Sequence, residues 1–498
     1  MGVRRYVADS DTTITNAFEA NLTTRGTGSN MGASDILEVF TIHGQISSSV
    51  SAANAEQARL LIKFPISGTN LDIETIHRDR ANGIIPTNGN VSFYLRIFNA
   101  PHAETLPENF DLDIKKMTAA WEEGRGLDMD EYQDLGYANW VKRNSTTDWS
   151  AAGAEGNYDN ITSTNFLNGD EDLEIDITST VEAWLSSPAS NYGLMVRNTN
   201  TQISGTVGSF YTKKFFGRGT EFHFKRPVIE ARWDSCRKDQ RSNFILSSSL
   251  VTAANNVNTL WLYNRLRGEL TDIPSLTGNT MDLRVYSASA DGVPYGDPIT
   301  LIKSDGSSVT SVDAGRATEN GITLTGVYTA SFTTANTASV FYDVWSTGSG
   351  DTERTFHTGS FTPISQEASI SDPAISYVTK VTNLKSSYTT DEEPRLRVFV
   401  RNKDWSPNIY TVAKSEVVPT IVDAAFYEVY RLSDDTIAIP YGTGSDNHTK
   451  LSYDKDGNYF DLDMTLLESG YAYGIRLAYY LQGQYREQPE VFKFRVQD

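Results

Sequence analysis

The sequence predicts an all-β protein made of three β-sandwich domains. Short runs rich in aromatic and β-branched residues recur along the chain, and in residues 91–97 apolar and polar side chains alternate. A period of two is typical of strands with one buried face. Clusters of Gly, Asn, Asp, Ser and Thr separate the runs and supply turns. At 498 residues, the chain exceeds what one hydrophobic core usually organises.

The first domain is expected to span residues 1–235. Its strands are bounded by turn residues, and a long loop rich in acidic and aromatic residues interrupts them after residue 117. Strands of this length and spacing are typical of a sandwich. They are expected at residues 36–42, 59–64, 91–97, 113–117, 173–177, 194–196 and 228–233.

The clearest local pattern, within residues 172–197, predicts a strand, a short helix, a turn and a second strand. The first strand alternates apolar and acidic residues. Ser179 stands three residues before Glu182, which is the spacing of a capping box at a helix start. Trp184 belongs to an apolar face of about two turns, and Pro188 is expected to end the helix. We expect the Trp184 ring to fill the core of the sandwich.

Two immunoglobulin-like sandwiches are expected to follow, over residues 236–366 and 367–498. Short strands separated by Gly, Asp and Ser clusters recur in both regions, a pattern typical of such folds. The segment Gly326-Val-Tyr is similar to the entry of an immunoglobulin-like strand whose tyrosine stabilises a corner. Residues 468–473 show a similar pattern in the third domain. Asp456 followed by glycine predicts a hairpin there.

The charge balance argues against a nucleic-acid surface. The net charge is −20, whereas binding to phosphates requires clustered Lys and Arg. The one basic and aromatic cluster lies within residues 213–226. For this cluster, contact with an acidic neighbouring subunit is favoured over contact with DNA, so no direct nucleic-acid partner is expected.

The cysteine count and the hydropathy pattern limit the chain further. Cys236 is the single cysteine, so a disulfide within the chain is excluded, and the thiol is expected to be inert. The first residues contain no apolar segment, and no secretory signal peptide is expected. No run of about 18 apolar residues occurs, so no membrane span is expected.

Six acidic residues crowd one loop of the first domain. Paired carboxylates can serve glycoside hydrolysis or bind Ca²⁺, but their spacing fits no calcium-loop template. A solvated acidic loop is the favoured interpretation, and neither a catalytic residue nor a metal is expected. The six residues are Glu122, Glu123, Asp128, Asp130, Glu131 and Asp134.

Three aromatic residues of the same region, Trp140, Trp149 and Tyr158, are the candidates for binding a glycan. Aromatic faces suit the apolar faces of sugars, although packing within a core or against a loop is the commoner role. The six histidines are scattered without the spacing of metal ligands, and no nucleotide-binding or catalytic motif occurs. No cofactor is therefore expected.

Residues 1–235 resemble the DNRLRE-type β-sandwich, a module also classed with carbohydrate-binding modules. The resemblance covers a little under half of the chain and implies a jelly-roll-type sandwich in which Trp121 and Glu122 are structural. Eight short motifs occur in the order of that family. They include residues 29–39, 59–64, 93–96, 118–122, 176–184, 191–197 and 226–231, together with Trp140.

The whole chain also resembles structural virion proteins of tailed phages, particularly marine ones, with residues 215–227 and 401–407 among the similar segments. This resemblance implies a particle component without an enzymatic step. Its partners would be other virion proteins and copies of itself, and its location the virion, after assembly in the host cytoplasm without a signal peptide. The alternatives are an adhesin that binds a host surface glycan through residues 1–235, and, more weakly supported, an enzyme acting on polysaccharide.

Overall fold

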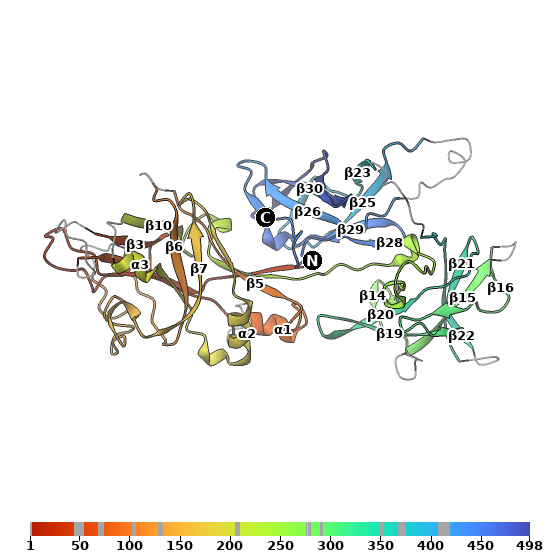
Figure 1. The fold of residues 1–498 in the computed structure, drawn as a ribbon, viewed down its shortest axis with the longest axis horizontal. Coiled ribbons are helices and arrows are strands. Elements are labelled where there is room, and N and C mark those ends of the chain that lie inside the picture. Colours follow the sequence, from red (N-terminus) through yellow and green to blue (C-terminus); the bar gives the residue numbers. More distant parts are fainter. Residues whose placement is uncertain are drawn as a thin grey trace. The chain divides into compact units, whose positions relative to one another are not determined.

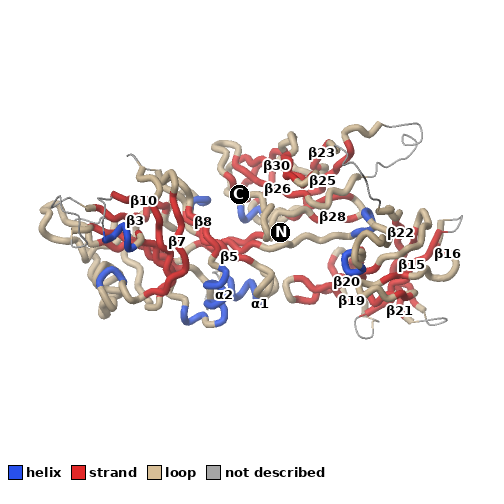
Figure 2. The backbone as a smooth tube through the Cα atoms, in the orientation of Figure 1, coloured by secondary structure: helices blue, strands red, loops and turns tan. Residues whose placement is uncertain are grey.

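In a computed structural model, 45% of the chain is strand and 9% is helix, and the strands form several sandwich-type sheets (Figure 1). Figure 2 shows how strands dominate over helices throughout. The predicted all-β class is confirmed. The chain divides into two compact units, Val3–Trp233 and Asp234–Asp498 with Met1–Gly2. The structure describes residues 2–43, 54–67, 74–101, 106–127, 133–204, 210–274, 276, 280–288, 292–348, 353–366, 375–406 and 419–498.

The unit Val3–Trp233 is a sandwich of two antiparallel sheets. Its strands are β1 Val3–Val7, β2 Ser10–Thr15, β3 Ile36–Ile42, β4 Glu56–Lys63, β5 Ser92–Ile97, β6 Phe110–Met117, β7 Tyr158–Phe166, β8 Leu173–Asp176, β9 Leu194–Asn198, β10 Phe210–Phe216 and β11 Val228–Arg232. One sheet has the order β1-β11-β5-β8, and the other the order β10-β3-β4-β9-β6-β7 with β2 paired to β4. Its helices are α1 Ile76–Ala81, α2 Thr178–Ser186 and α3 Asn200–Ser204.

The main core of this unit lies between the two sheets. Phe93 and Leu95 on β5 contribute from the four-stranded sheet, and Leu60 and Ile62 on β4 contribute from the seven-stranded sheet. All four are fully buried. On β5 this follows from the alternation of apolar and polar residues in the sequence. Trp184 on α2 is 1% exposed and belongs to the same core, as predicted.

The helix α2 begins earlier than the capping-box prediction placed it. Ser179 already lies inside the helix and caps nothing. The backbone N–H of Thr178 instead donates to the Asp176 carboxylate at 2.8 Å, and the Thr178 hydroxyl accepts from the N–H of Phe93 at 2.8 Å. The second bond fastens the first residue of the helix to β5, which fixes the start there. The helix ends at Ser186, before Pro188, as predicted.

A second, smaller core covers part of the outer face of the seven-stranded sheet. Leu61 on β4 and Met195 on β9 point away from the main core because side chains alternate along a strand. The loop between β6 and β7 folds back over them and contributes Trp140 and Trp149. This sheet is therefore buried on both faces near β4 and β9, and the layer added by the loop frames the polar network described below.

The first part of the unit Asp234–Asp498 contains a seven-stranded sheet. Its strands are β12 Asn258–Tyr263, β15 Thr280–Ala288, β16 Pro294–Tyr295, β19 Val312–Glu319, β20 Ile322–Phe332, β21 Phe341–Thr347 and β22 Arg354–Phe361, in the order β12-β20-β19-β15-β21-β22 with β16 paired to β15. Two short hairpins accompany it, β13 Arg265–Leu266 with β14 Glu269–Leu270, and β17 Leu301–Ile302 with β18 Ser308–Val309. Tyr328, which follows Gly326, accepts a hydrogen bond from the backbone N–H of Ile273 at 3.0 Å.

The last part of the chain has an immunoglobulin-like strand order. Its strands are β23 Tyr377–Val381, β24 Ser387–Thr389, β25 Arg395–Asn402, β26 Ala425–Arg431, β27 Ile437–Ile439, β28 Ser452–Asp454, β29 Gly457–Asp461, β30 Ala472–Leu481, β31 Gln484–Glu487 and β32 Phe492–Gln497. One sheet has the order β23-β25-β29-β28 and the other β24-β32-β30-β26-β27, with β31 paired to β30. This order corresponds to the ABED and GFC sheets of immunoglobulin folds. The predicted hairpin before Gly457 joins β28 to β29.

A tyrosine corner stabilises this sandwich at the start of β30. The Tyr473 hydroxyl accepts from the backbone N–H of Glu468 at 2.9 Å and donates to the carbonyl of Glu468 at 2.8 Å. A tyrosine that bonds back to the backbone just before this strand is typical of immunoglobulin-like domains. The corner lies in the segment where the sequence predicted an immunoglobulin-like strand entry.

The segment that opens the second unit is bonded to both of its sheet systems. Lys238 forms a parallel bridge with Tyr453 on β28, and the N–H of Asp239 donates to the Tyr453 carbonyl at 3.0 Å. Arg241 then donates to the buried carboxylate of Asp343 on β21 at 2.8 Å. A few consecutive residues thus connect the last sandwich with the sheet that precedes it.

Candidate functional site

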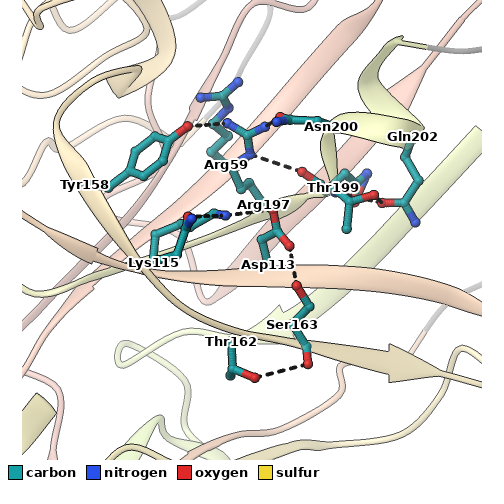
Figure 3. A network of polar contacts seen from close by, with 12 residues as sticks. Arg59, Asp113, Lys115, Tyr158, Thr162, Ser163, Arg197, Thr199, Asn200 and Gln202 are labelled. Carbon is teal, nitrogen blue, oxygen red and sulfur yellow. Dashed lines mark hydrogen bonds and ion pairs between the residues drawn. The ribbon is translucent and has the colours of Figure 1, made fainter. Parts of the chain in front are cut away.

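A network of polar side chains crosses the outer face of the seven-stranded sheet of the first unit, as Figure 3 shows. Arg59 lies on β4, Arg197 on β9, Asp113 and Lys115 on β6, and Tyr158 on β7. The register places Arg197 opposite Asp113 on the neighbouring strand. Because adjacent residues of these strands enter the main core, the charged side chains point to the other face.

Two buried arginines share one carboxylate at the centre of the network. The side chains of Arg59 and Arg197 are only 3% and 2% exposed. Glu155 Oε1 lies 2.8 Å from a terminal nitrogen of Arg59 and 2.5 Å from one of Arg197. Tyr158 donates its hydroxyl to Glu155 Oε2 at 2.5 Å and accepts from Arg197 at 2.9 Å. Charge-assisted bonds of this kind are the strong ones in proteins.

Burial and proximity of charge set the protonation states here. Burial, together with the nearby Arg197 charge, lowers the pKa of Arg59 to about 10, so its guanidinium remains charged at neutral pH. Burial alone would raise the pKa of Glu155, but the two arginines and the Tyr158 hydroxyl outweigh it and hold the pKa below its usual range. Burial and the bond to Glu155 raise the pKa of Tyr158. Two cations and one anion therefore face each other around Glu155.

A strained turn carries Glu155 to the arginines. Gly153, Ala154 and Gly156 all have positive φ angles, of 76°, 64° and 75°. A Cβ at Gly153 would lie 2.7 Å from the Trp140 ring, so only glycine fits there. The carbonyl of Gly153 accepts from Arg59 at 2.5 Å, and the Arg59 guanidinium lies 4.9 Å from the centre of the Trp140 ring. The network thus locks the loop between β6 and β7 onto the sheet.

The network extends along the edge of the sheet. Lys115 lies 2.8 Å from the Asp113 carboxylate and donates to Asn160 at 2.7 Å. Asp113 also accepts from the Ser163 hydroxyl at 2.5 Å. Side chains of β7 are therefore held in place by charged groups of β6. Chemically, the network is a framework of ion pairs and hydrogen bonds whose groups bind chiefly one another.

The three aromatic candidates all pack at the second core but differ in exposure. Trp140 and Trp149 are 7% and 5% exposed and belong to the second core, so neither presents a ring face to a sugar. Both rings instead pack within a core, the commoner role of such residues, because the loop folds back onto the sheet. Tyr158 is half-buried, with Lys115 and Arg197 over its ring at 5.6 and 5.7 Å from the centroid.

The acidic residues of the same loop do not form a single group. Glu123 binds Arg218 through two bonds of 2.9 and 2.6 Å and also accepts from the N–H of Asp11. Asp134 is buried and accepts from Asn30 at 3.1 Å. Glu122 is exposed, while Asp128, Asp130 and Glu131 lie outside the described residues. Within the described part of the chain, no group of three or more acidic, His or Cys residues is arranged to hold a metal.

Sequence reasoning missed Asp11, Arg59 and Arg197 as members of buried networks. Burial raises the pKa of Asp11 to about 7, against the opposing effects of the Arg218 backbone N–H and guanidinium. The available signal was a charged residue inside an otherwise strand-like run, as in Arg59-Leu-Leu-Ile. A charge at such a position requires a partner, but the partner itself cannot be read from the run.

The basic and aromatic cluster is largely paired within the chain. Lys213 is buried and donates to Asn99, to the carbonyl of Gly169 and to that of Glu171, at 2.7 to 2.8 Å. Burial lowers the pKa of Lys213 to about 8. Lys214 pairs with Glu38 at 3.0 Å. These lysines are therefore committed to contacts inside the sandwich.

The single thiol is also held inside the structure. Cys236 donates to the carbonyl of Leu451 at 3.3 Å. Burial raises the pKa of Cys236 to about 12, and a protonated thiol is a poor nucleophile. This environment supports the expectation that the residue is inert.

Comparisons with known proteins give little beyond the fold. No family model and no curated protein matches the chain. A crystal structure of the chicken CNTN1 FN1-FN3 domains aligns with 81% of this chain and 98% of its own, at 10% identity and a TM-score of 0.15. This score defines no common overall architecture. No described helix is long and apolar enough to cross a membrane.

Proposed function

We propose that this chain is a non-enzymatic structural component of a tailed-phage virion, in its neck, its tail or the exterior of its capsid. The observation that carries the proposal is that the charged side chains around Glu155 pair with one another. The two most buried cations there, Arg59 and Arg197, bind one internal carboxylate and fasten a loop to a rigid sheet. The resemblance of segments such as residues 215–227 and 401–407 to structural virion proteins favours the same role.

The mechanism is passive and depends on rigid modules. Each sandwich presents sheet faces and strand edges to neighbouring subunits, while its own loops are held by ion pairs and hydrogen bonds. In a symmetric particle the same weak contact is repeated many times, and avidity makes the assembly stable. The partners are other virion proteins and further copies of this chain.

Mass spectrometry of purified particles tests this proposal. We expect the chain at a fixed stoichiometry in particles banded on a density gradient and washed in high salt, together with the major capsid protein. Antibodies against the purified chain should label the neck, the tail or the capsid exterior in electron micrographs. Absence of the chain from intact particles would sink the proposal.

A second candidate function is binding of a host glycan by the first sandwich. The favouring observation is the rim of the network, where the half-buried ring of Tyr158 and the exposed side chain of Asn160 both contact Lys115. A glycan array with the full chain tests it. Selective binding that is lost in Tyr158→Ala, but kept in Tyr295→Ala at an exposed tyrosine of the second unit, would favour the adhesin; a blank array would remove it.

A further inference from the structure

The strand β7 forms one end of the seven-stranded sheet in the first unit (Figure 1). Among the described residues it pairs on one side only, with β6, from Tyr158 opposite Met117 to Phe166 opposite Phe110. A strand in this position presents a row of backbone N–H and C=O groups to a further strand. Most of its side chains are exposed, namely Asp159, Asn160, Thr162, Ser163 and Asn165.

The sequence of β7 lacks the usual protection of an edge. Natural edge strands are commonly shielded by lysine or proline, and β10, at the other end of the same sheet, carries the partly exposed Lys214. The nine residues of β7 include no Lys, Arg or Pro, and Asp159 is their one carboxylate. Tyr, Ile, Thr and Phe, which favour strands, make up most of the rest. A bulge at Ile161 is the one irregularity in its pairing with β6.

The strand is also complementary to a second copy of itself. If two copies of β7 run antiparallel with Thr162 opposite Thr162, no like charges face each other, and threonine faces threonine at the centre. A threonine pair directly opposite across two strands is favourable. The bulge then falls at equivalent places on either side of the symmetry axis. The resulting pairs are Tyr158 with Phe166, Asp159 with Asn165, Asn160 with Thr164, and Ile161 with Ser163.

We propose that β7 is a self-association edge, at which a second copy of this chain adds its own β7 antiparallel, centred on Thr162. The contact is isologous, so it closes as a pair. The strand is prepared for it, because Lys115 holds Asn160 and Asp113 holds Ser163. Holding side chains in place before association lowers its entropic cost. The inference deepens the proposed structural role by naming one partner and one surface.

Cysteine cross-linking tests both the edge and the register. Cys236 is the only cysteine, so Cys236→Ser gives a clean background for Thr162→Cys and, as a matched control, Thr164→Cys. Opposed residues lie about 5 Å apart across an antiparallel pair, within reach of a disulfide. The Thr164 positions would be offset by about 14 Å along the strands. We expect a disulfide-linked dimer of the full chain with Thr162→Cys alone; no dimer, or equal dimer with both, would overturn the proposal.

Sedimentation equilibrium of the full chain provides a second measurement. Thr162→Lys places two like charges at the symmetry axis, and we expect it to weaken dimerisation at least tenfold. Thr355→Lys on β22 makes the same change at another exposed strand position and should leave dimerisation unchanged. A wild-type chain that stays monomeric, or a dimer indifferent to Thr162→Lys, contradicts the proposal. If the chain dimerises but is absent from purified particles, the virion assignment fails, whereas the inference about β7 stands.

Discussion

At the scale of single residues, the first unit carries charges in places where a strand usually buries apolar groups. Asp11 and Arg59 both lie in strands and are 1% and 3% exposed. Their neighbours determine whether the cost of burying the charge is offset. Arg59 is paired with Glu155. For Asp11, burial outweighs the attraction of Arg218 and raises the pKa of the carboxyl group. The two residues should therefore affect stability in opposite ways.

We predict that Asp11→Asn stabilises the first unit at pH 8 and not at pH 4. The pKa of Asp11 is about 7 in the folded chain, against 3.8 for an ordinary aspartate, so the folded state holds its proton more tightly. The contribution of Asp11 to the free energy of unfolding is then most favourable at low pH and falls as pH rises through 4 to 7, by an amount on the order of 4 kcal/mol. Asparagine removes this dependence.

Hydrogen exchange of β2 and β4 in the full chain, compared across this pH range, measures the effect of Asp11→Asn. It reports local stability without requiring that the whole chain unfold in one step. If the wild-type chain and the variant respond to pH in parallel, the ionisation of Asp11 is not coupled to folding and the prediction fails.

We predict that Glu155→Gln destabilises the first unit by about 2–3 kcal/mol. This is less than the effect expected for a fully buried ion pair, because the Glu155 side chain is 38% exposed and solvent screens its charge. The change leaves two buried guanidiniums without their shared anion. Since the pKa of Glu155 is lowered, the stabilisation is present above the ordinary glutamate pKa and is lost as pH falls through the folded value. Urea unfolding measures it, and Glu122→Gln, at an exposed position, should change stability by less than about 0.5 kcal/mol.

At the scale of elements, short hydrogen-bonded devices decide where strands and helices begin. Asp176 and Thr178 start α2, and Tyr473 fixes the entry into β30. In each device a side-chain oxygen supplies a hydrogen-bond partner to the backbone, from a neighbouring residue or, for Phe93, from one far along the chain. Such devices are therefore sensitive to the loss of one oxygen atom.

We predict that Tyr473→Phe destabilises the last sandwich by about 1–3 kcal/mol, because the partly buried N–H and C=O of Glu468 lose their shared partner. Tyr471→Phe is the matched control, since Tyr471 is 38% exposed and keeps its ring contact with Arg431. Hydrogen exchange at β30 distinguishes the two variants. Equal effects would contradict the role assigned to the corner.

Local elements were also the part of the structure that the sequence predicted best. The run that became β3 was predicted over its full length, at residues 36–42, because alternation and turn residues are local signals. The capping box at Ser179 failed, since the bond from Phe93 to Thr178 comes from a distant strand. The site failed for the same reason: the run at Arg59 shows a buried charge, but its partner Glu155 lies on a loop far along the chain.

At the scale of the whole molecule, residues 238–241 connect the two sheet systems of the second unit. Arg241 lies against two carboxylates, those of Asp239 and Asp343, at 2.6 and 2.8 Å. Tyr453 bonds to the same segment through its backbone. The two sheet systems of this unit thus share a set of contacts instead of meeting only at a flexible linker.

We predict that Arg241→Met destabilises the second unit by about 3–5 kcal/mol, the usual effect of removing one partner from a buried ion pair. Asp343 is fully buried and would lose its cation. Calorimetry of the full chain should show the loss in the transition of the second unit. Arg265→Met, at an exposed position of β13, should leave that transition in place; equal shifts would count against the assigned role.

The partly buried thiol of Cys236 has a consequence for durability. Since burial raises its pKa to about 12, only a very small fraction of molecules carries the reactive thiolate at pH 7. Oxidants and disulfides react with the thiolate, so the folded chain resists both. Neighbouring copies of the folded chain therefore do not become linked by disulfides when they move from a reducing to an oxidising environment. Contacts between such copies remain non-covalent and reversible.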